Sequence, residues 1–175
     1  MEIIENSAQT ILSIKEDLIG PARQRNTAAV SLSGMISNTV ANMGLPDGVV
    51  EIEWAGNLPD VYVDARQMEQ VFNNLIKNSW EAMTNTPSPK IVVNGQRDHD
   101  PKFVLVTVQD NGPGIPKEIQ EKIWVSFFTT KGGNGGTGLG LSACVQIVNQ
   151  HGGSISLESE SGKGAKFSVR LPVEK

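Results

Sequence analysis

The segment 65–83 carries five polar residues spaced for one face of a helix. They are Gln70, Asn74, Lys77, Asn78 and Glu81. Residues three and four positions apart project from the same side of a helix, so these side chains would converge. Asparagine is a poor helix former, which indicates that the two are present for their amide oxygens. Asn78 offers the kind of neutral oxygen that Mg²⁺ accepts beside phosphate and water ligands. A plain solvated helix face is the alternative.

A second candidate is the segment DNGPGIP (110–116), which follows a predicted strand directly. Asp110 at a strand end is placed for the floor of a pocket, where its carboxylate can accept a hydrogen bond from an exocyclic amine such as that of adenine. Such charged hydrogen bonds contribute about 1.5–3 kcal/mol. Gly112 and Gly114 leave room for a planar base near the backbone. A simple tight turn is the other interpretation.

A third candidate is GGNGGTGLG (132–140), which ends where a helix is predicted to begin. Backbone amides at a helix N-terminus bind anions, and glycines let a phosphate approach them. Lys131, immediately before the glycines, can place its ammonium group on a terminal phosphate. The spacing fits neither the Walker motif nor the dinucleotide fingerprint. The segment could also be a flexible linker, although linkers rarely run straight into an apolar helix.

The elements that must position these residues alternate along the chain. Asp64 and Gln67 form a capping-box pattern, which predicts that the polar helix begins there. Its other face should be buried and comprises Met68, Val71, Phe72, Leu75, Ser79 and Ala82. Other predicted helices cover 30–44 and 139–150, and strands cover 49–54, 90–96, 103–109, 154–158 and 165–171, with a glycine-rich loop over 110–140. This order predicts an α+β fold: a two-layer α/β sandwich, with a mixed sheet and helices on one face.

Residues 1–20 are expected to form a helical appendage before a single domain that covers residues 21–175. The apolar seam consists of Ile4, Ala8, Ile11, Ile14 and Leu18, and the segment Gly20-Pro21 ends the helix. A seam of this length can pair with a second copy or lie on the domain. We favour self-association from the sequence.

Composition excludes several classes of protein. The chain has 175 residues and a net charge of −4, without a basic cluster that would follow a nucleic-acid backbone. Its single cysteine, Cys144, rules out a disulfide framework and indicates a reducing, cytoplasmic setting. No stretch is long and apolar enough to span a membrane, so we expect no direct membrane contact, although the parent protein could be membrane-anchored.

The motifs together resemble the histidine kinase branch of the superfamily that includes the ATPase domains of DNA gyrase, a heat-shock chaperone and a mismatch-repair protein. The resemblance covers about residues 50–172. QVFNNLIKNSWEAM (70–83) resembles the N box, DNGPGIP (110–116) the first glycine box, WVSFFTTK (124–131) the F box and GGTGLGLS (135–142) the second glycine box. SGKGAKFSVRLP (161–172) resembles the closing strand pair. The joint order of these motifs is specific, and it implies the Bergerat-type ATP-binding fold.

The resemblance also implies roles for individual residues. Asn78 would bind Mg²⁺, Asp110 would read adenine, and Asn74, Lys77 and Lys131 would act at the phosphates as the catalytic residues. The lid would be anchored by Phe127 and Phe128. The nucleotide-binding set would further include Gly112, Gly114, Ile115, Gly136, Thr137, Gly138, Leu139, Gly140 and Ser168.

Two departures bear on the reaction. In hydrolytic members of the superfamily a glutamate stands one turn before the Mg²⁺ asparagine, whereas this chain has Asn74 there. An amide cannot take a proton from water, so the sequence favours transfer over hydrolysis. The two histidines, His99 and His151, do not match the family's phosphoacceptor box, and we expect both to be structural or solvent-facing. Ser79 and Ala165 also replace residues more usual in the family.

The sequence therefore predicts a protein histidine kinase catalytic domain that uses Mg-ATP. Its γ-phosphate would pass to a histidine on a dimerisation domain absent from this chain, for relay to an aspartate of a response regulator. The full-length parent is expected to be a homodimer, with residues 1–20 as the end of the dimerising hairpin. Alternatives are a noncatalytic nucleotide-sensing module and a serine kinase of the anti-sigma type.

Overall fold

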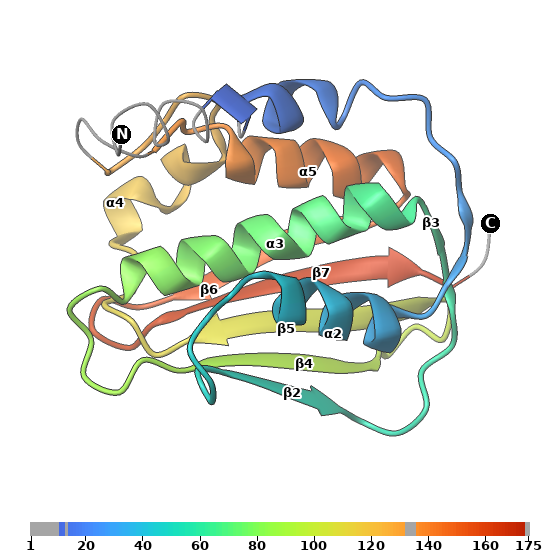
Figure 1. Cartoon of the computed structure of the whole chain (residues 1–175), viewed down its shortest axis with the longest axis horizontal. Helices are drawn as coiled ribbons and strands as arrows, with labels where there is room; N and C mark the ends of the chain where they lie inside the picture. Colours follow the sequence, from blue (N-terminus) through green and yellow to red (C-terminus); the bar gives the residue numbers. More distant parts are fainter. Residues whose placement is uncertain (1–10, 13, 132–135, 174–175) are drawn as a thin grey trace.

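A mixed five-stranded sheet forms one layer of the molecule (Figure 1). The computed structural model describes residues 11, 12, 14–131 and 136–173. The strand order is β2-β4-β5-β7-β6, with β2 parallel to β4 and the remaining pairs antiparallel. These strands are β2 (Val50–Trp54), β4 (Ile91–Arg97), β5 (Phe103–Asp110), β6 (Ser154–Ser159) and β7 (Ala165–Pro172).

The second layer consists of helices on one face of the sheet (Figure 1). They are α2 (Leu32–Asn42), α3 (Ala65–Ala82) and α5 (Gly140–Gln150). The predicted two-layer α/β sandwich is therefore confirmed, and each strand and helix predicted between residues 30 and 171 lies within two residues of its expected bounds.

Several short elements were not predicted. β1 (Ala28–Val30) and β3 (Val61–Val63) pair as a separate antiparallel sheet. α4 (Lys117–Gln120) and the 3₁₀ helix η1 (Lys122–Trp124) interrupt the segment that we expected to be mainly loop. Elements of three or four residues are too short to show the periodicity that identifies longer ones.

Helix α3 crosses the sheet with its apolar face buried, as its pattern predicted. Met68, Phe72 and Leu75 are fully buried in the core that also contains Val106 and Val108 of β5. Full burial of one such side chain contributes about 1.5–3 kcal/mol, so this face fixes the helix on the sheet. Ala82, expected on the same face, is exposed at the end of the helix.

The start of α3 is capped by Asp64, as predicted, but only half of the capping box forms. Asp64 Oδ1 accepts hydrogen bonds from the backbone amides of Arg66 (3.0 Å) and Gln67 (3.2 Å). Gln67 Oε1 does not accept from the backbone amide of Asp64, because that amide donates to His151 Nε2 at 3.1 Å. Gln67 Nε2 donates to the carbonyl oxygen of Gly20 at 2.7 Å. The side chain at this position ties the N-terminal segment to α3 instead.

Residues 14–19 are helical and dock on α3 through a polar face rather than through the predicted seam. Asp17 and Gly20 are buried, whereas Ile11 and Leu18 are 66% and 54% exposed. Ile4 and Ala8 of the predicted seam lie outside the described residues. None of the helices in the described part of the chain is long and apolar enough to cross a membrane.

Candidate functional site

A cavity of about 560 Å³ opens between α3, the start of α5, the loop after β5 and the lid segment that precedes α5. It brings together most residues that the sequence singled out. These are Asn74, Lys77, Asn78, Asp110, Gly114, Ile115, Lys131, Gly136, Thr137, Gly138 and Gly140. Residues as far apart in the chain as Asn74 and Gly140 therefore meet at one place.

Asp110 lies at the deep end of this cavity, only 5% exposed, where β5 ends. Its Oδ1 accepts hydrogen bonds from the backbone amides of Gly112 (2.9 Å) and Ala165 (3.2 Å). Among the described residues nothing donates to Oδ2. The carboxylate is therefore fixed by the backbone through one oxygen and keeps the other for a ligand.

Apolar side chains surround this end of the cavity. The cavity wall includes Ile115, Ile123, Phe128, Ala165 and Phe167. Apolar side chains together with the buried carboxylate of Asp110 suit a planar heterocycle with one amino group, because the rings gain burial while the amine gains a charged acceptor.

Three predicted ligand-binding residues do not line the cavity. Ser168 follows Phe167 on β7, and since side chains alternate along a strand it points to the other face of the sheet. Gly112 acts through its amide on Asp110, and Leu139 is buried behind the lid. We therefore leave Ser168 out of the proposed site. Its β7 neighbours Ala165 and Phe167 line the cavity instead.

The exposed side of α3 forms another part of the cavity wall, which carries polar side chains and is here called the open end. Asn74 Nδ2 donates to Asp17 Oδ1 (3.1 Å) and to the carbonyl oxygen of Gly140 (3.3 Å). Asn78 also lines the cavity, and its side chain makes no hydrogen bond with the described residues. Gln70, expected to join this group, instead donates to the carbonyl oxygen of Glu16 at 2.9 Å.

Two lysines at this end share one carboxylate. Lys131 Nζ forms an ion pair with Glu81 Oε2, and Lys77 Nζ lies 3.9 Å from Glu81 Oε1. Both lysines line the cavity. An arriving phosphate would have to compete with Glu81 for them, which the sequence did not indicate.

Two glycines of the lid and its neighbourhood are required by backbone geometry. Gly138 has φ +67°, and a Cβ there would lie 2.4 Å from the carbonyl carbon of Phe127. Gly114 has φ +72°, and its Cβ would lie 2.1 Å from the carbonyl oxygen of Glu160. Side chains at these positions would push the lid and the first glycine loop away from their supports.

The two phenylalanines expected to anchor the lid behave differently. Phe128 packs against the core and lines the cavity. Phe127 is 72% exposed, and its backbone amide donates to the carbonyl oxygen of Gly138 at 2.8 Å. Only Phe128 anchors the lid through its side chain.

Sequence reasoning missed two polar residues at the cavity, Asp17 and Ser79. Ser79 is 2% exposed, and its hydroxyl oxygen is buried with no hydrogen-bond partner among the described residues. An unpaired buried hydroxyl costs about 1–3 kcal/mol, so its place in a cavity wall suits a site whose polar groups are completed by a ligand. Its position one residue after Asn78 was the available signal.

The residues present fit Mg-ATP on these observations. The deep end offers an apolar wall and an unpaired carboxylate oxygen, and the open end offers two lysines and two asparagine amides. No three His, Cys, Asp or Glu side chains within the described ranges cluster to hold a metal. A hard cation would therefore take most of its oxygen ligands from phosphate and water, with Asn78 as the protein ligand.

The histidines lie outside this cavity, as expected. His99 is exposed in the turn between β4 and β5. His151 is 7% exposed; its Nε2 accepts from the backbone amide of Asp64 (3.1 Å), and its Nδ1 lies 2.8 Å from the carbonyl oxygen of Ile147. Burial lowers the pKa of His151, against the opposing effect of the Ile147 carbonyl. A neutral imidazole with both nitrogens engaged is structural.

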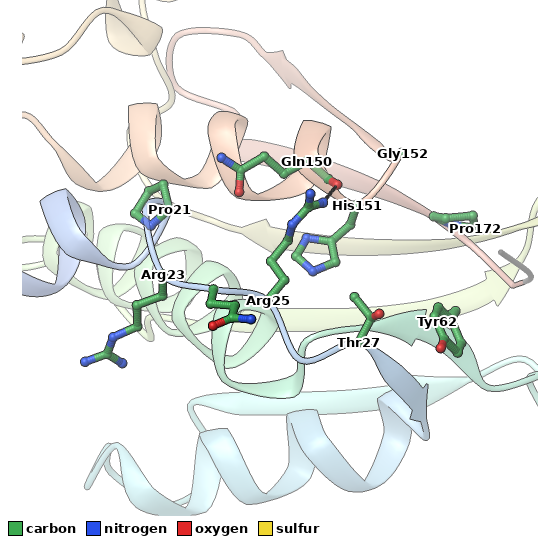
Figure 2. A pocket seen from close by; sticks show the side chains of 10 residues that line it. Pro21, Arg23, Arg25, Thr27, Tyr62, Gln150, His151, Gly152 and Pro172 are labelled. Carbon is green, nitrogen blue, oxygen red and sulfur yellow. Dashed lines mark hydrogen bonds between the residues drawn. The ribbon is translucent and has the colours of Figure 1, made fainter.

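A second cavity, of about 930 Å³, lies beside the other end of α5 (Figure 2). Arg25 reaches across it and donates to the carbonyl oxygen of Gln150, and His151 lies next to this contact. Tyr62 and Pro172 complete the wall in Figure 2. None of the predicted ligand-binding residues lies here.

Comparison with known proteins agrees with the geometry. The family model "Histidine kinase-, DNA gyrase B-, and HSP90-like ATPase" matches residues 63–175. The chain belongs to this family. It is therefore an ATP-binding domain of that family, and the resemblance to histidine kinase catalytic domains is confirmed.

The adaptive-response sensory kinase SasA of Synechococcus sp. (strain CC9311) is 31% identical over an alignment of 188 positions, gaps included. The alignment covers 98% of this chain and 47% of that protein. The sensory histidine kinase/phosphatase NtrB of Salmonella typhimurium is 31% identical over an alignment of 187 positions, gaps included. The alignment covers 99% of this chain and 52% of that protein. The chain thus spans about half the length of these relatives.

Solved structures show the same fold. The catalytic domain of the histidine kinase ThkA, in a nucleotide-free form, superposes with a TM-score of 0.71 at 31% identity and covers 84% of this chain and 95% of that one. ThkA in complex with the response regulator protein TrrA gives a TM-score of 0.74 at 24% identity, covering 98% of this chain and 50% of that one.

Proposed function

We propose that this chain is the ATP-binding catalytic domain of a sensor histidine kinase, which transfers the γ-phosphoryl group of ATP to a histidine outside this chain. The observation that carries the proposal is Asp110, a buried carboxylate fixed by two backbone amides at the apolar end of the cavity. Lysine and asparagine side chains stand at the open end. The names of the relatives support the same reading.

Asp110 selects the base in this proposal. Its free Oδ2 accepts a hydrogen bond from the exocyclic amine of adenine, and a base without that amine leaves the buried carboxylate unpaired. Ile115 and Phe167 pack against the rings and exclude water, which strengthens this bond.

The open end holds the phosphates. When bound, ATP supplies the phosphoryl group and Mg²⁺ neutralises its charge. Asn78 contributes its amide oxygen to the metal, and Lys77 and Lys131 exchange Glu81 for phosphate oxygens. Asn74 cannot accept a proton, so no side chain at that position activates water, and a neutral imidazole acceptor needs no such activation.

The partners in this proposal are a phosphoacceptor histidine domain, a second copy of the parent protein and a response regulator. Residues 1–20 would belong to the end of the dimerising hairpin, which is consistent with the exposed Ile11 and Leu18. The TrrA complex of ThkA, which shares the fold, is one example of a kinase bound to a regulator. A cytoplasmic location of this domain is part of the proposal.

The test is to extend the chain with its natural upstream hairpin and incubate it with γ-labelled ATP and Mg²⁺. We expect label on protein that is lost in acid and retained in base, as for phosphohistidine, and no label in the Asp110→Asn variant. Acid-stable label would instead indicate a serine kinase. Nucleotide binding without any label would indicate a noncatalytic sensing module.

A further inference from the structure

Asp17 is a buried carboxylate that the proposed function does not yet use. It is 7% exposed, and it comes from the N-terminal helix rather than from the domain that matches the family. Desolvation by burial raises the pKa of Asp17, although hydrogen bonds from Asn74 and Gln70 and the charge of Lys77 oppose the change. Burying a carboxylate is costly, so the contact requires partners that compensate.

The partners of Asp17 are amide groups of α3. Asn74 Nδ2 donates to Asp17 Oδ1 at 3.1 Å, and Gln70 Nε2 lies 3.4 Å from the same oxygen. The second hydrogen of Asn74 Nδ2 goes to the carbonyl oxygen of Gly140 at 3.3 Å. An amide has two N–H donors, so both are used.

Engagement of both donors fixes the orientation of the Asn74 amide. An amide is planar, so its oxygen must lie on the side away from the two acceptors. Asn74 lines the cavity, and its Oδ1 accepts no hydrogen bond from the described residues. The oxygen stands one helical turn before that of Asn78, on the same face of α3.

We propose that Asp17 is a positioning residue, which holds the Asn74 amide so that its oxygen, together with that of Asn78, faces the divalent cation or a water bound to it. The inference rests on the proposed function, since it needs a cation in this cavity. Hydrogen bonds behind a ligand orient it, and their loss typically costs about 10–100-fold in metal affinity. The helix that ends at Gly20 thereby becomes part of the metal side of the site.

The experiment compares Asp17→Ala, Asp17→Asn and the control Glu16→Ala. The alanine removes the acceptor, and the asparagine keeps an oxygen at its place without the charge. Glu16 is a neighbouring carboxylate that forms an ion pair with Arg23 at 3.5 Å. Calorimetry measures the dissociation constant of ATP with Mg²⁺ and with EDTA. The dissociation constant in EDTA divided by that in Mg²⁺ gives a ratio that reports the contribution of the metal.

We expect the ratio to fall about tenfold in Asp17→Ala and to stay near the parent value in Asp17→Asn and Glu16→Ala. An unchanged ratio in Asp17→Ala overturns the inference. Equal losses in Asp17→Ala and Asp17→Asn overturn it as well, because they assign the effect to charge. A parent chain that binds no ATP overturns the proposed function together with this inference.

A second readout needs no nucleotide. NMR of the free protein would follow the exchange of the side-chain amide protons of Asn74 with water, from which hydrogen bonding protects them. Asp17→Ala should accelerate this exchange, and Asp17→Asn should keep it slow. Slow exchange in Asp17→Ala, in protein whose melting transition remains cooperative, contradicts the positioning role.

Discussion

The polar side chains of the two cavities differ in how fully they are hydrogen-bonded within the protein. Beside the C-terminal end of α5, His151 uses both ring nitrogens, and Arg25 is bonded to Gln150 (Figure 2). In the cavity between α3 and the lid, Asp110 keeps one oxygen free and Asn78 makes no hydrogen bond with the described residues. Polar groups that satisfy one another maintain a fold, whereas convergent groups left unpaired in a concave site indicate a ligand.

A further contrast exists within the ligand cavity itself. Asp110 is held by the backbone and is ready for a base, whereas Lys131 and Lys77 are held by Glu81. If the proposed function holds, the base side of the site is preformed, and the phosphate side must exchange internal contacts for ligand contacts. Substitutions at the two ends should differ in direction as well as in size.

The largest effect is expected for Asp110→Asn. The variant loses the charged acceptor and places an amide against the donors of Gly112 and Ala165. ATP affinity should fall about 100-fold, in line with the upper end of about 1.5–3 kcal/mol for a charged hydrogen bond. Calorimetry on protein with an unchanged circular dichroism spectrum measures it. Parent-like binding would remove Asp110 from the site.

Asn78→Ala should have the next largest effect, and one confined to the metal. Affinity for Mg-ATP should fall about tenfold, while affinity for ATP in EDTA changes little, because only the amide oxygen of a metal ligand is removed. The exposed Asn73, one residue before Asn74 on α3, gives the matched control Asn73→Ala. Equal losses with and without Mg²⁺ would assign Asn78 to the nucleotide itself.

Glu81→Gln should strengthen binding rather than weaken it. It releases Lys131 and Lys77 for phosphate and removes a negative charge from the cavity mouth. These side chains are partly exposed, so a gain of up to about fivefold is expected, and added salt should reduce it. Titrations of parent and variant at low and high salt measure the gain. Weaker binding in the variant would show that Glu81 itself supports the ligand.

The smallest effect concerns the other cavity. Burial lowers the pKa of His151 from an ordinary value of 6.5, with Arg25 acting in the same direction and the Ile147 carbonyl and Asp64 opposing it. The unfolded chain then binds a proton more readily than the folded chain. The stabilising contribution is complete above about pH 6.5 and is lost as the pH falls below that value.

Urea denaturation between pH 7.5 and 5.5 checks this expectation against the variant His151→Gln. The parent should lose about 1 kcal/mol or less over this range, and the variant should lose less than the parent. Equal slopes in the two proteins would show that His151 does not carry the dependence. A changed nucleotide affinity in His151→Gln would contradict the assignment of His151 to a structural role only.

Sequence predicted the frame well where elements are long and periodic. The burial of Met68, Phe72 and Leu75 follows from spacing alone, as does the Asp64 cap. Asp110 and Asn78 could be found because a chemically distinct residue ends a strand or recurs on one helix face. These signals depend on residues close together in the sequence, so they can be recognised before the fold is known.

What could not be predicted depends on contacts between distant segments. No local pattern shows that Asp17 reaches Asn74, that Glu81 pairs with Lys131, or that Gln67 bonds Gly20 instead of completing its capping box. Ser168 was misplaced by one residue on β7, and a one-residue step on a strand turns a side chain to the other face.

The most direct test maps where the nucleotide binds. Backbone and side-chain amide shifts of the parent chain are followed by NMR during titration with a nonhydrolysable ATP analogue and Mg²⁺. The account predicts changes at Gly112, Ala165 and the side-chain amides of Asn74 and Asn78, with Gln150 and His151 unaffected. Changes centred on Arg25, Gln150 and His151, or no changes at millimolar nucleotide, would contradict it.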